Sequence, residues 1–163
     1  MTVKTGLGQD SHSFDENQDK DLILAGVKFD DGPPLKGNSN ADVVLHAITN
    51  SISSITGRNI LGKIADRMCL KKGITDSSEY LKLALQDLED WHITHLAVSI
   101  ECVKPIITPK IEAMKQSLSD ILEINAKDIG ITATSGESLT PFGRGEGIQA
   151  FAIITVENKK GEV

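Results

Sequence analysis

Several residue types and patterns are scarce in this 163-residue sequence. Aromatic residues make up only 4% of it, so a platform on which nucleic-acid bases stack is not expected. No apolar run approaches the roughly 18–20 residues of a membrane-spanning helix, and the first residues lack the apolar stretch of a secretory signal. The two cysteines, Cys69 and Cys102, form no Cys-x-x-Cys pair. We therefore expect reduced packing cysteines in a cytoplasmic protein.

Positive charge is also scarce. Lysine and arginine total 17 against 23 acidic residues, which gives a net charge of -6 at pH 7. Because nucleic acids and anionic membranes attract a basic face, neither is expected as a partner. A protein of this charge would have to hold phosphates with a few placed groups and metal ions. The length predicts a single domain, over residues 1–157, followed by a polar tail over residues 158–163.

Hydrophobic periodicity predicts strands that alternate with helices. Strands are expected over residues 3–8, 96–103, 129–135 and 147–156, and over 22–29 as a strand or hairpin that turns at Gly26. Helices are expected from Ala41 to Gly57, from Ser77 or Ser78, and from Thr108 to about Leu122. Turn formers fill residues 30–40, where Ser39 or Asn40 is suited to cap the next helix, and residues 60–76 remain ambiguous. The alternation predicts an α/β two-layer sandwich, a mixed sheet with helices packed on one face.

The stretch over residues 6–14 opens as an apolar strand and carries Asp10 and His12. In an extended chain, side chains two residues apart point to the same face. Asp10 and His12 therefore offer a carboxylate oxygen and an imidazole nitrogen to one point in space. These are two of the three protein ligands of a catalytic zinc site. The alternative is an aspartate that starts a turn beside a surface histidine.

A third ligand is available on the helix that follows. Asp42 and His46 are four residues apart, so they share one helical face, and His46 could complete the site. One carboxylate and two histidines form the catalytic zinc set, and the same ligand types form the iron centre of some oxygenases. The alternative is a buried His46 that is hydrogen-bonded to a strand carbonyl.

Residues 132–147 form a second candidate site. They place hydroxyls, glycines and Arg144 after a predicted strand. Backbone N–H groups, hydroxyls and a guanidinium can together cradle a phosphate. Residues 143–147 lead into a strand, so they are not a dinucleotide-binding fingerprint, which opens a helix. The alternative is an ordinary flexible hairpin connection.

Three motifs taken together resemble one family. They are Gly6-x-Gly8-x-Asp10-x-His12, then Ser39-x-x-Asp42-x-x-x-His46, then Thr132-Ala-Thr-Ser135-x-Glu137 followed by Gly143-Arg-Gly-Glu-Gly147. In order and spacing, and over nearly the whole chain, they are similar to the 2-C-methyl-D-erythritol 2,4-cyclodiphosphate synthases of the non-mevalonate isoprenoid pathway. The resemblance implies a homotrimer of α/β subunits with active sites between neighbouring subunits. It also implies the bacterial cytosol or a plastid-type organelle as the location.

The resemblance implies metal ions and substrate contacts as well. Zn²⁺ is expected at Asp10, His12 and His46. Glu137 is expected to help bind a Mg²⁺ or Mn²⁺ ion that bridges the substrate diphosphate. Residues 102–108 are expected to recognise cytidine. The implied catalytic residues are Asn38 and Ser135, and the implied substrate contacts are Ser39, Asp66, Cys102, Lys104, Pro105, Ile106, Ile107, Thr108, Thr134, Ser135, Glu137, Phe142 and Arg144.

The implied reaction is an intramolecular phosphoryl transfer. The 2-phosphate of 4-diphosphocytidyl-2-C-methyl-D-erythritol 2-phosphate attacks the β-phosphorus and displaces CMP, which leaves the cyclic diphosphate. An enzyme of this kind is a phosphorus-oxygen lyase. Its work is mostly positioning and charge stabilisation, because the nucleophile is already an anion.

The sequence departs from the family pattern at several positions. Asn38 stands where the family has a histidine assigned to transition-state stabilisation, Ser135 replaces a threonine, and Asn50 and Ile60 replace aspartates. Two other functions stay open, the first because of these changes and the second because its iron centre uses the same ligand types. One is a catalytically weakened module that binds metal and cytidine nucleotides without turnover. The other is a non-haem iron enzyme, although such enzymes are usually β-rich barrels.

Overall fold

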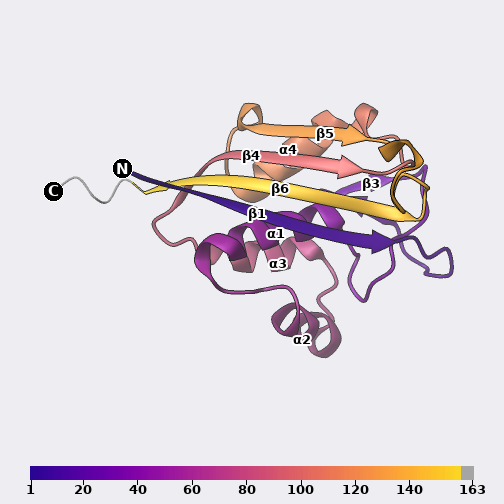
Figure 1. Cartoon of the computed structure of the whole chain (residues 1–163). Coiled ribbons are helices and arrows are strands. Elements are labelled where there is room, and N and C mark those ends of the chain that lie inside the picture. The colour runs from indigo at the N-terminus through magenta and orange to yellow at the C-terminus, as the bar shows by residue number, and fades with distance from the viewer. Residues whose placement is uncertain (159–163) are drawn as a thin grey trace.

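Residues 1–158 are described by a computed structural model, in which helices cover one face of a four-stranded sheet (Figure 1). The strand order is β1-β6-β4-β5; β6 is antiparallel to β1 and β4, and β4 is parallel to β5. The strands are β1 (Thr2–Ser13), β4 (His92–Glu101), β5 (Ile129–Thr134) and β6 (Gly147–Asn158). The α-helices are α1 (Val43–Thr56), α2 (Lys63–Lys72), α3 (Ser77–Gln86) and α4 (Ile111–Leu122), and β2 (Leu22–Leu24) and β3 (Val27–Phe29) form a hairpin. This arrangement confirms the predicted α/β fold with a mixed sheet.

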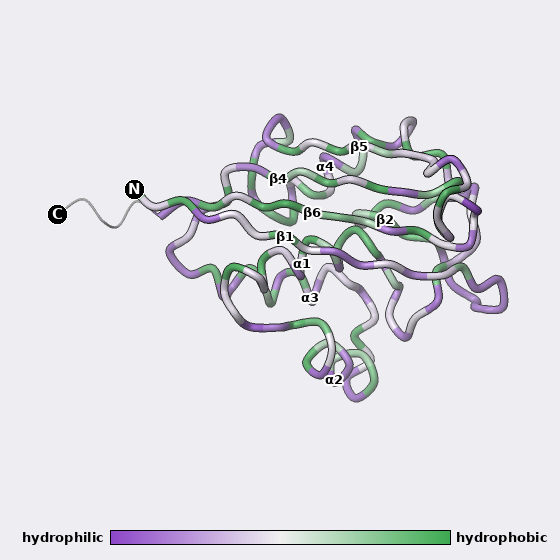
Figure 2. The backbone as a smooth tube through the Cα atoms, in the orientation of Figure 1, coloured by the Kyte–Doolittle hydropathy of each residue, from purple (hydrophilic) through white to green (hydrophobic). Residues whose placement is uncertain are grey.

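The sheet has one buried face and one open face. On β6, Ile148 and Ile154 are fully buried against the helices, whereas Phe151 and Ile153 point outward and are 40% and 45% exposed. Figure 2 shows the hydrophobic character of β6 and of its neighbour β4. The core therefore lies between the sheet and the helical layer, and the open face keeps apolar side chains of its own.

Two glycines of β1 let α1 lie directly on the sheet. A Cβ atom on Gly8 would lie 2.0 Å from the carbonyl oxygen of Ala47, and one on Gly6 would lie 2.1 Å from that of Ser51. Contacts this short do not occur, so any larger residue would push α1 away from the strand. Because His46 directly precedes Ala47, these glycines set the distance between His46 and β1.

Asp42 caps the N-terminus of α1, so the prediction of a cap at Ser39 or Asn40 was wrong. The Asp42 carboxylate accepts hydrogen bonds from the N–H groups of Leu45 at 3.1 Å and Gly26 at 2.7 Å. The two oxygens of a carboxylate can accept several N–H groups at once, in the helix and in a neighbouring turn. Asp42 is therefore a better cap than Ser39 or Asn40. Burial raises the pKa of Asp42, and its oxygens are occupied by backbone donors. Asp42 therefore has a structural role.

The other elements differ from prediction mainly in their limits. β1 and β6 are longer than predicted because they pair with each other along their whole length. The ambiguous residues 60–76 contain α2, which ends at Gly73 in the left-handed conformation. Residues 159–163, most of the predicted tail, lie outside the described residues. Among the helices of residues 1–158, none combines the length and apolarity needed to cross a membrane.

Candidate active site

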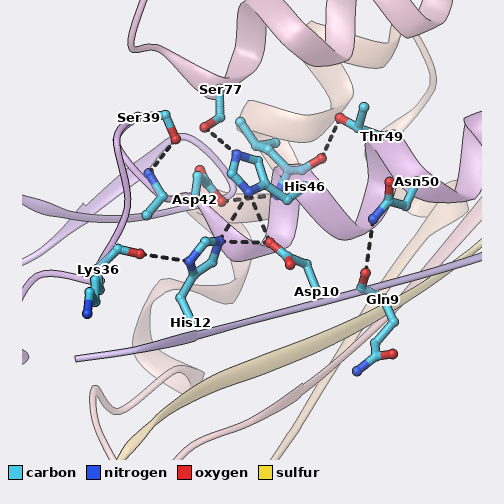
Figure 3. Close-up of polar contacts among 12 residues, drawn as sticks. Gln9, Asp10, His12, Lys36, Ser39, Asp42, His46, Thr49, Asn50 and Ser77 are labelled. Carbon is cyan, nitrogen blue, oxygen red and sulfur yellow. Dashed lines mark hydrogen bonds and ion pairs between the residues drawn. The ribbon is translucent and has the colours of Figure 1, made fainter. Parts of the chain in front are cut away.

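Asp10, His12 and His46 converge on one point (Figure 3). β1 carries Asp10 and His12 on its helix-covered side, and α1 carries His46. The Asp10 Oδ2 atom lies 2.8 Å from His12 Nε2 and 3.0 Å from His46 Nδ1, and these two nitrogens are 3.3 Å apart. One ligand atom from each residue lies within 4.8 Å of the others. The predicted group is therefore confirmed as an arrangement able to bind a metal ion.

The outer nitrogen of each histidine already has a protein partner. His12 Nδ1 lies 2.8 Å from the carbonyl oxygen of Lys36, and His46 Nε2 lies 2.9 Å from Ser77 Oγ. A carbonyl oxygen only accepts, so neutral His12 carries its proton on Nδ1 and leaves the Nε2 lone pair for a metal. One carboxylate and two oriented imidazoles are donors that fit Zn²⁺ or another divalent transition metal.

The charge on Asp10 also suits a cation. Burial pulls the pKa of Asp10 upward, but hydrogen bonds and charge attraction from His12 and His46 outweigh it and hold the pKa well below its ordinary value. Burial lowers the pKa of His12, but the hydrogen bond to Asp10 and the negative charge of Asp10 outweigh burial and raise the pKa above its ordinary value. Asp10 is thus an anion at neutral pH, and it attracts positive charge to the point between the two rings.

Asp10, His12 and His46 line a pocket that α2 helps to form. The predicted residues Asn38, Ser39 and Asp66 line this pocket too. Its wall also includes residues that the sequence did not assign to the site, which are Gly37, Asn50, Leu61, Gly62, Ala65, Cys69 and Tyr80. The four-residue spacing of positions 61, 65 and 69 places them on one side of α2 and its preceding turn. This spacing was a usable signal, but it lay in the segment whose structure stayed ambiguous.

Three consecutive carbonyl groups before α1 are held by two side chains that sequence analysis did not place in the site. Lys20 Nζ donates to the carbonyl groups of Gly37 at 2.9 Å and Ser39 at 2.8 Å. Cys69 Sγ donates to that of Asn38 at 3.2 Å. Burial lowers the pKa of Lys20. With the backbone held in this way, the side chains of Asn38 and Ser39 line the pocket.

The predicted nucleotide-binding segments meet where β4 and β5 end. The N–H of Cys102 donates to the carbonyl of Thr134 at 3.1 Å, which joins the two segments. Ser135 Oγ accepts from the N–H of Glu137 at 3.4 Å, so the hydroxyl proton stays available to donate. Burial raises the pKa of the Cys102 thiol to about 11, which fits its predicted packing role. Among the predicted contacts, the exposed ones are Lys104, Ile106, Thr108, Thr134, Ser135, Glu137 and Arg144; Phe142 is half-buried; Cys102, Pro105 and Ile107 are buried.

The metal group (Asp10, His12 and His46) and the predicted nucleotide-binding segments lie at the same end of the sheet but on opposite edges. The paired residues Ser11, Gln149, Glu101 and Thr134 follow one another across β1, β6, β4 and β5. Three strand spacings separate the two outer strands, which amounts to about 14 Å. Within the described chain, the two groups are therefore apart, and Glu137 lies away from Asp10, His12 and His46.

Residues 3–157 match the YgbB family. A 2-C-methyl-D-erythritol 2,4-cyclodiphosphate synthase of Chlamydia caviae is 48% identical over 155 residues, which cover 94% of this chain and 88% of that protein. The synthase of Chlamydia trachomatis serovar L2b is 43% identical over 155 residues, which cover 94% of this chain and 87% of that protein. Both alignments take in almost the whole chain.

Solved structures share the fold. The bifunctional IspDF from Campylobacter jejuni aligns with a TM-score of 0.87 and 26% identity over 96% of this chain, which spans 42% of that longer protein. A CDP complex of IspF from Plasmodium falciparum aligns with a TM-score of 0.80 and 23% identity, over 97% of each chain. The sheet and helices that carry the metal group thus have counterparts in known structures.

Proposed function

This chain belongs to the YgbB family, and we propose that, with a metal ion held by Asp10, His12 and His46, it performs the reaction for which its Chlamydia relatives are named. It converts 4-diphosphocytidyl-2-C-methyl-D-erythritol 2-phosphate into 2-C-methyl-D-erythritol 2,4-cyclodiphosphate and releases CMP. The observation that carries the proposal is the complete group of one carboxylate and two histidines in the lining of a pocket. Because those relatives are bacterial and the substrate is water-soluble, the cytosol is the proposed location.

The reaction forms one P–O–P linkage and breaks another. An oxygen of the 2-phosphate attacks the β-phosphorus, and the bond from that phosphorus to the oxygen it shares with the α-phosphate breaks, so CMP leaves with the electron pair. A divalent ion at the metal group, Zn²⁺ in this proposal, would orient phosphate oxygens and offset their charge when bound. Asp10 contributes the anionic ligand, and His12 and His46 contribute the nitrogens that face it.

Hydrogen-bond donors supply the remaining stabilisation. The Asn38 amide lines the pocket and can donate to a phosphate oxygen, but it carries no charge, so we expect a slower chemical step than a histidine would give. Ser135 is proposed to donate a hydrogen bond from its hydroxyl to the transferring phosphoryl group. Glu137 is proposed to help hold Mg²⁺ or Mn²⁺ against the diphosphate, since carboxylate oxygens suit that ion.

Turnover of the diphosphocytidyl substrate, with zinc and magnesium supplied, tests the function directly by phosphorus NMR. Formation of CMP together with the cyclic diphosphate would establish the reaction and show that Asn38 supports it. Tight binding of a cytidine nucleotide without release of CMP would favour the weakened binding module instead. Neither binding nor release would reject the assignment. The non-haem iron alternative loses its support, because the described fold is an open sheet covered by helices.

Arg144 is proposed to contact the substrate diphosphate. Its Nε atom lies 3.1 Å from Glu146 Oε1, and its side chain is 48% exposed, so other guanidinium donors remain available to an anion. Arg144→Ala is expected to weaken CDP binding by about 1.5–3 kcal/mol, the range for hydrogen bonds to charged groups. Arg58 is a matched control, because it also pairs with an acid, Asp87 at 2.7 Å, and is 50% exposed. Calorimetry that finds equal CDP affinity for Arg144→Ala and Arg58→Ala would contradict this contact.

We also propose that the active protein is a homotrimer with each active site shared by two subunits. The open face of the sheet carries an apolar patch in which Leu7, 58% exposed, pairs across the strands with Ile153, and Phe151 follows. Contiguous exposed apolar side chains of this kind mark protein interfaces. A second copy could bring the end of its β5 to the β1 edge of the first, which would join the metal group to nucleotide segments that lie apart in one subunit.

The mass in solution tests the assembly. Sedimentation equilibrium is expected to give three times the 17.5 kDa of one chain. Phe151→Glu places a charge in the apolar patch, and we expect it to lower the mass toward that of a single chain. A wild-type protein that sediments as a monomer at micromolar concentration, yet turns over its substrate, would overturn the shared site.

A further inference from the structure

The two ring nitrogens of His46 face different surroundings. Nδ1 lies 3.0 Å from Asp10 Oδ2 and 3.3 Å from His12 Nε2, on the side of the proposed metal ion. Nε2 lies 2.9 Å from the hydroxyl oxygen of Ser77, which is fully buried as the first residue of α3 (Figure 3). Of the two ring nitrogens, Ser77 thus contacts the one that is turned away from the metal group.

The second hydrogen-bond partner of Ser77, Asn40, determines which atom donates in each of these hydrogen bonds. Ser77 Oγ lies 2.5 Å from Asn40 Oδ1, and the same amide oxygen accepts the backbone N–H of Asp42 at 3.2 Å. An amide oxygen has no proton, so the Ser77 hydroxyl must be the donor to Asn40. The Ser77 oxygen is then left to accept a hydrogen bond from the N–H at His46 Nε2. This places the proton of neutral His46 on Nε2 and the lone pair on Nδ1.

We propose that Ser77, supported by Asn40, is a positioning residue for the metal site. The relay from Asn40 through Ser77 to His46 holds the ring in the tautomer and orientation that aim Nδ1 at Asp10 and His12. A partner on the outer nitrogen of a metal-binding histidine fixes its tautomer and raises its basicity, and its loss typically costs 10–100-fold in metal affinity. The proposal rests on the metal ion of the proposed function.

The relay also links the metal group to the substrate pocket. Asn40 follows Asn38 and Ser39, whose side chains line that pocket, and its backbone N–H donates to the carbonyl of Thr75 just before α3. One amide side chain therefore connects the pocket-lining loop and the start of α3 to a metal ligand. His12 differs, because its outer nitrogen uses a backbone carbonyl that no substitution removes. Ser77 is thus the partner through which mutation can test the orientation of a metal ligand.

The test measures metal binding itself. Zn²⁺ affinity, by competition with a chelating dye, and the visible absorption of bound Co²⁺ are compared for wild type, Ser77→Ala and Ser53→Ala. Ser53 is a matched control, since it is a buried serine whose Oγ has no hydrogen-bond partner within the described residues. Ser77→Ala is expected to lose about 10–100-fold in Zn²⁺ affinity and to alter the Co²⁺ spectrum. Ser53→Ala is expected to match the wild type in both.

The outcomes separate the relay from the metal site. A wild-type protein that takes up no Zn²⁺ overturns both. A wild type that binds Zn²⁺, with a folded Ser77→Ala protein that binds it equally well and gives the same Co²⁺ spectrum, overturns only the relay. Should Ser77→Ala fail to fold, Asn40→Ala tests the relay from its far end. It is expected to lower Zn²⁺ affinity, and wild-type affinity in the folded variant would overturn the proposal.

Discussion

The His46→Ala protein is expected to lose its metal ion and nearly all turnover while keeping its fold. His46 Nδ1 faces Asp10 and His12, so alanine removes one of three protein ligands. The charge stabilisation that a bound metal gives to a phosphoryl transition state is worth several kcal/mol. At about 1.36 kcal/mol for each factor of ten, turnover should fall by roughly 10³-fold or more.

The measurements are zinc content after dialysis, CMP release and thermal unfolding. The fold should persist because α1 keeps Ile48 and Ile52 in the core. The Ser77 hydroxyl loses its histidine partner, which we expect to lower the free energy of unfolding by about 1–3 kcal/mol. His95→Ala removes an exposed histidine of β4 and serves as the control. A His46→Ala protein with the zinc content and turnover of that control would reject the metal mechanism.

The metal ligands on β1 could be predicted because their relation is local. Side chains at positions 10 and 12 share a face in any extended strand, whatever surrounds it. His46 lies 36 residues beyond Asp10, and the periodicity of α1 placed it on a helix without showing which strand that helix covers. Residue type alone suggested His46 as the third ligand, and the order of the motifs, compared with a known family, supported joining the three. The described structure supplies the missing contact, through the close packing of α1 on β1.

Residues that act through tertiary contacts left no comparable pattern. Lys20 and Cys69 hold consecutive carbonyl groups from distant segments, and neither stands in a motif. Asp42 had the spacing of a ligand beside His46, but the backbone N–H groups around it make it a cap. Ile60, which the resemblance placed at a position where the family has an aspartate, is fully buried in the core. Local sequence patterns therefore predicted which residues could bind a metal or phosphate. Burial and long-range contacts determine what each residue does in the folded protein.

Gly8→Ala is expected to damage both stability and metal binding, although Gly8 has no side chain that could bind a metal ion. The added Cβ would lie 2.0 Å from the carbonyl oxygen of Ala47 and 2.3 Å from the nitrogen of Ser51, which are backbone atoms of α1. A backbone cannot rotate out of the way as a flexible side chain can, so the whole helix must move outward. Overpacking commonly lowers the free energy of unfolding by about 1–3 kcal/mol. Because this clash is with helix backbone, we expect a loss of about 3 kcal/mol or more. For a chain of this length, that corresponds to a fall in Tm of about 6–12 °C.

The effect on metal binding distinguishes this clash from ordinary destabilisation. His46 precedes Ala47, so an outward shift of α1 draws its Nδ1 away from Asp10, and we expect Zn²⁺ affinity to fall at least about tenfold in the folded protein. Gly130→Ala adds the same methyl group to β5 where no described atom beyond its chain neighbours would lie within 4 Å of the new Cβ, and it should keep Zn²⁺ affinity. Thermal unfolding and zinc competition on both variants decide the matter. If Gly8→Ala keeps the Tm and Zn²⁺ affinity of Gly130→Ala, then the close approach of α1 to β1 does not set the geometry of the site.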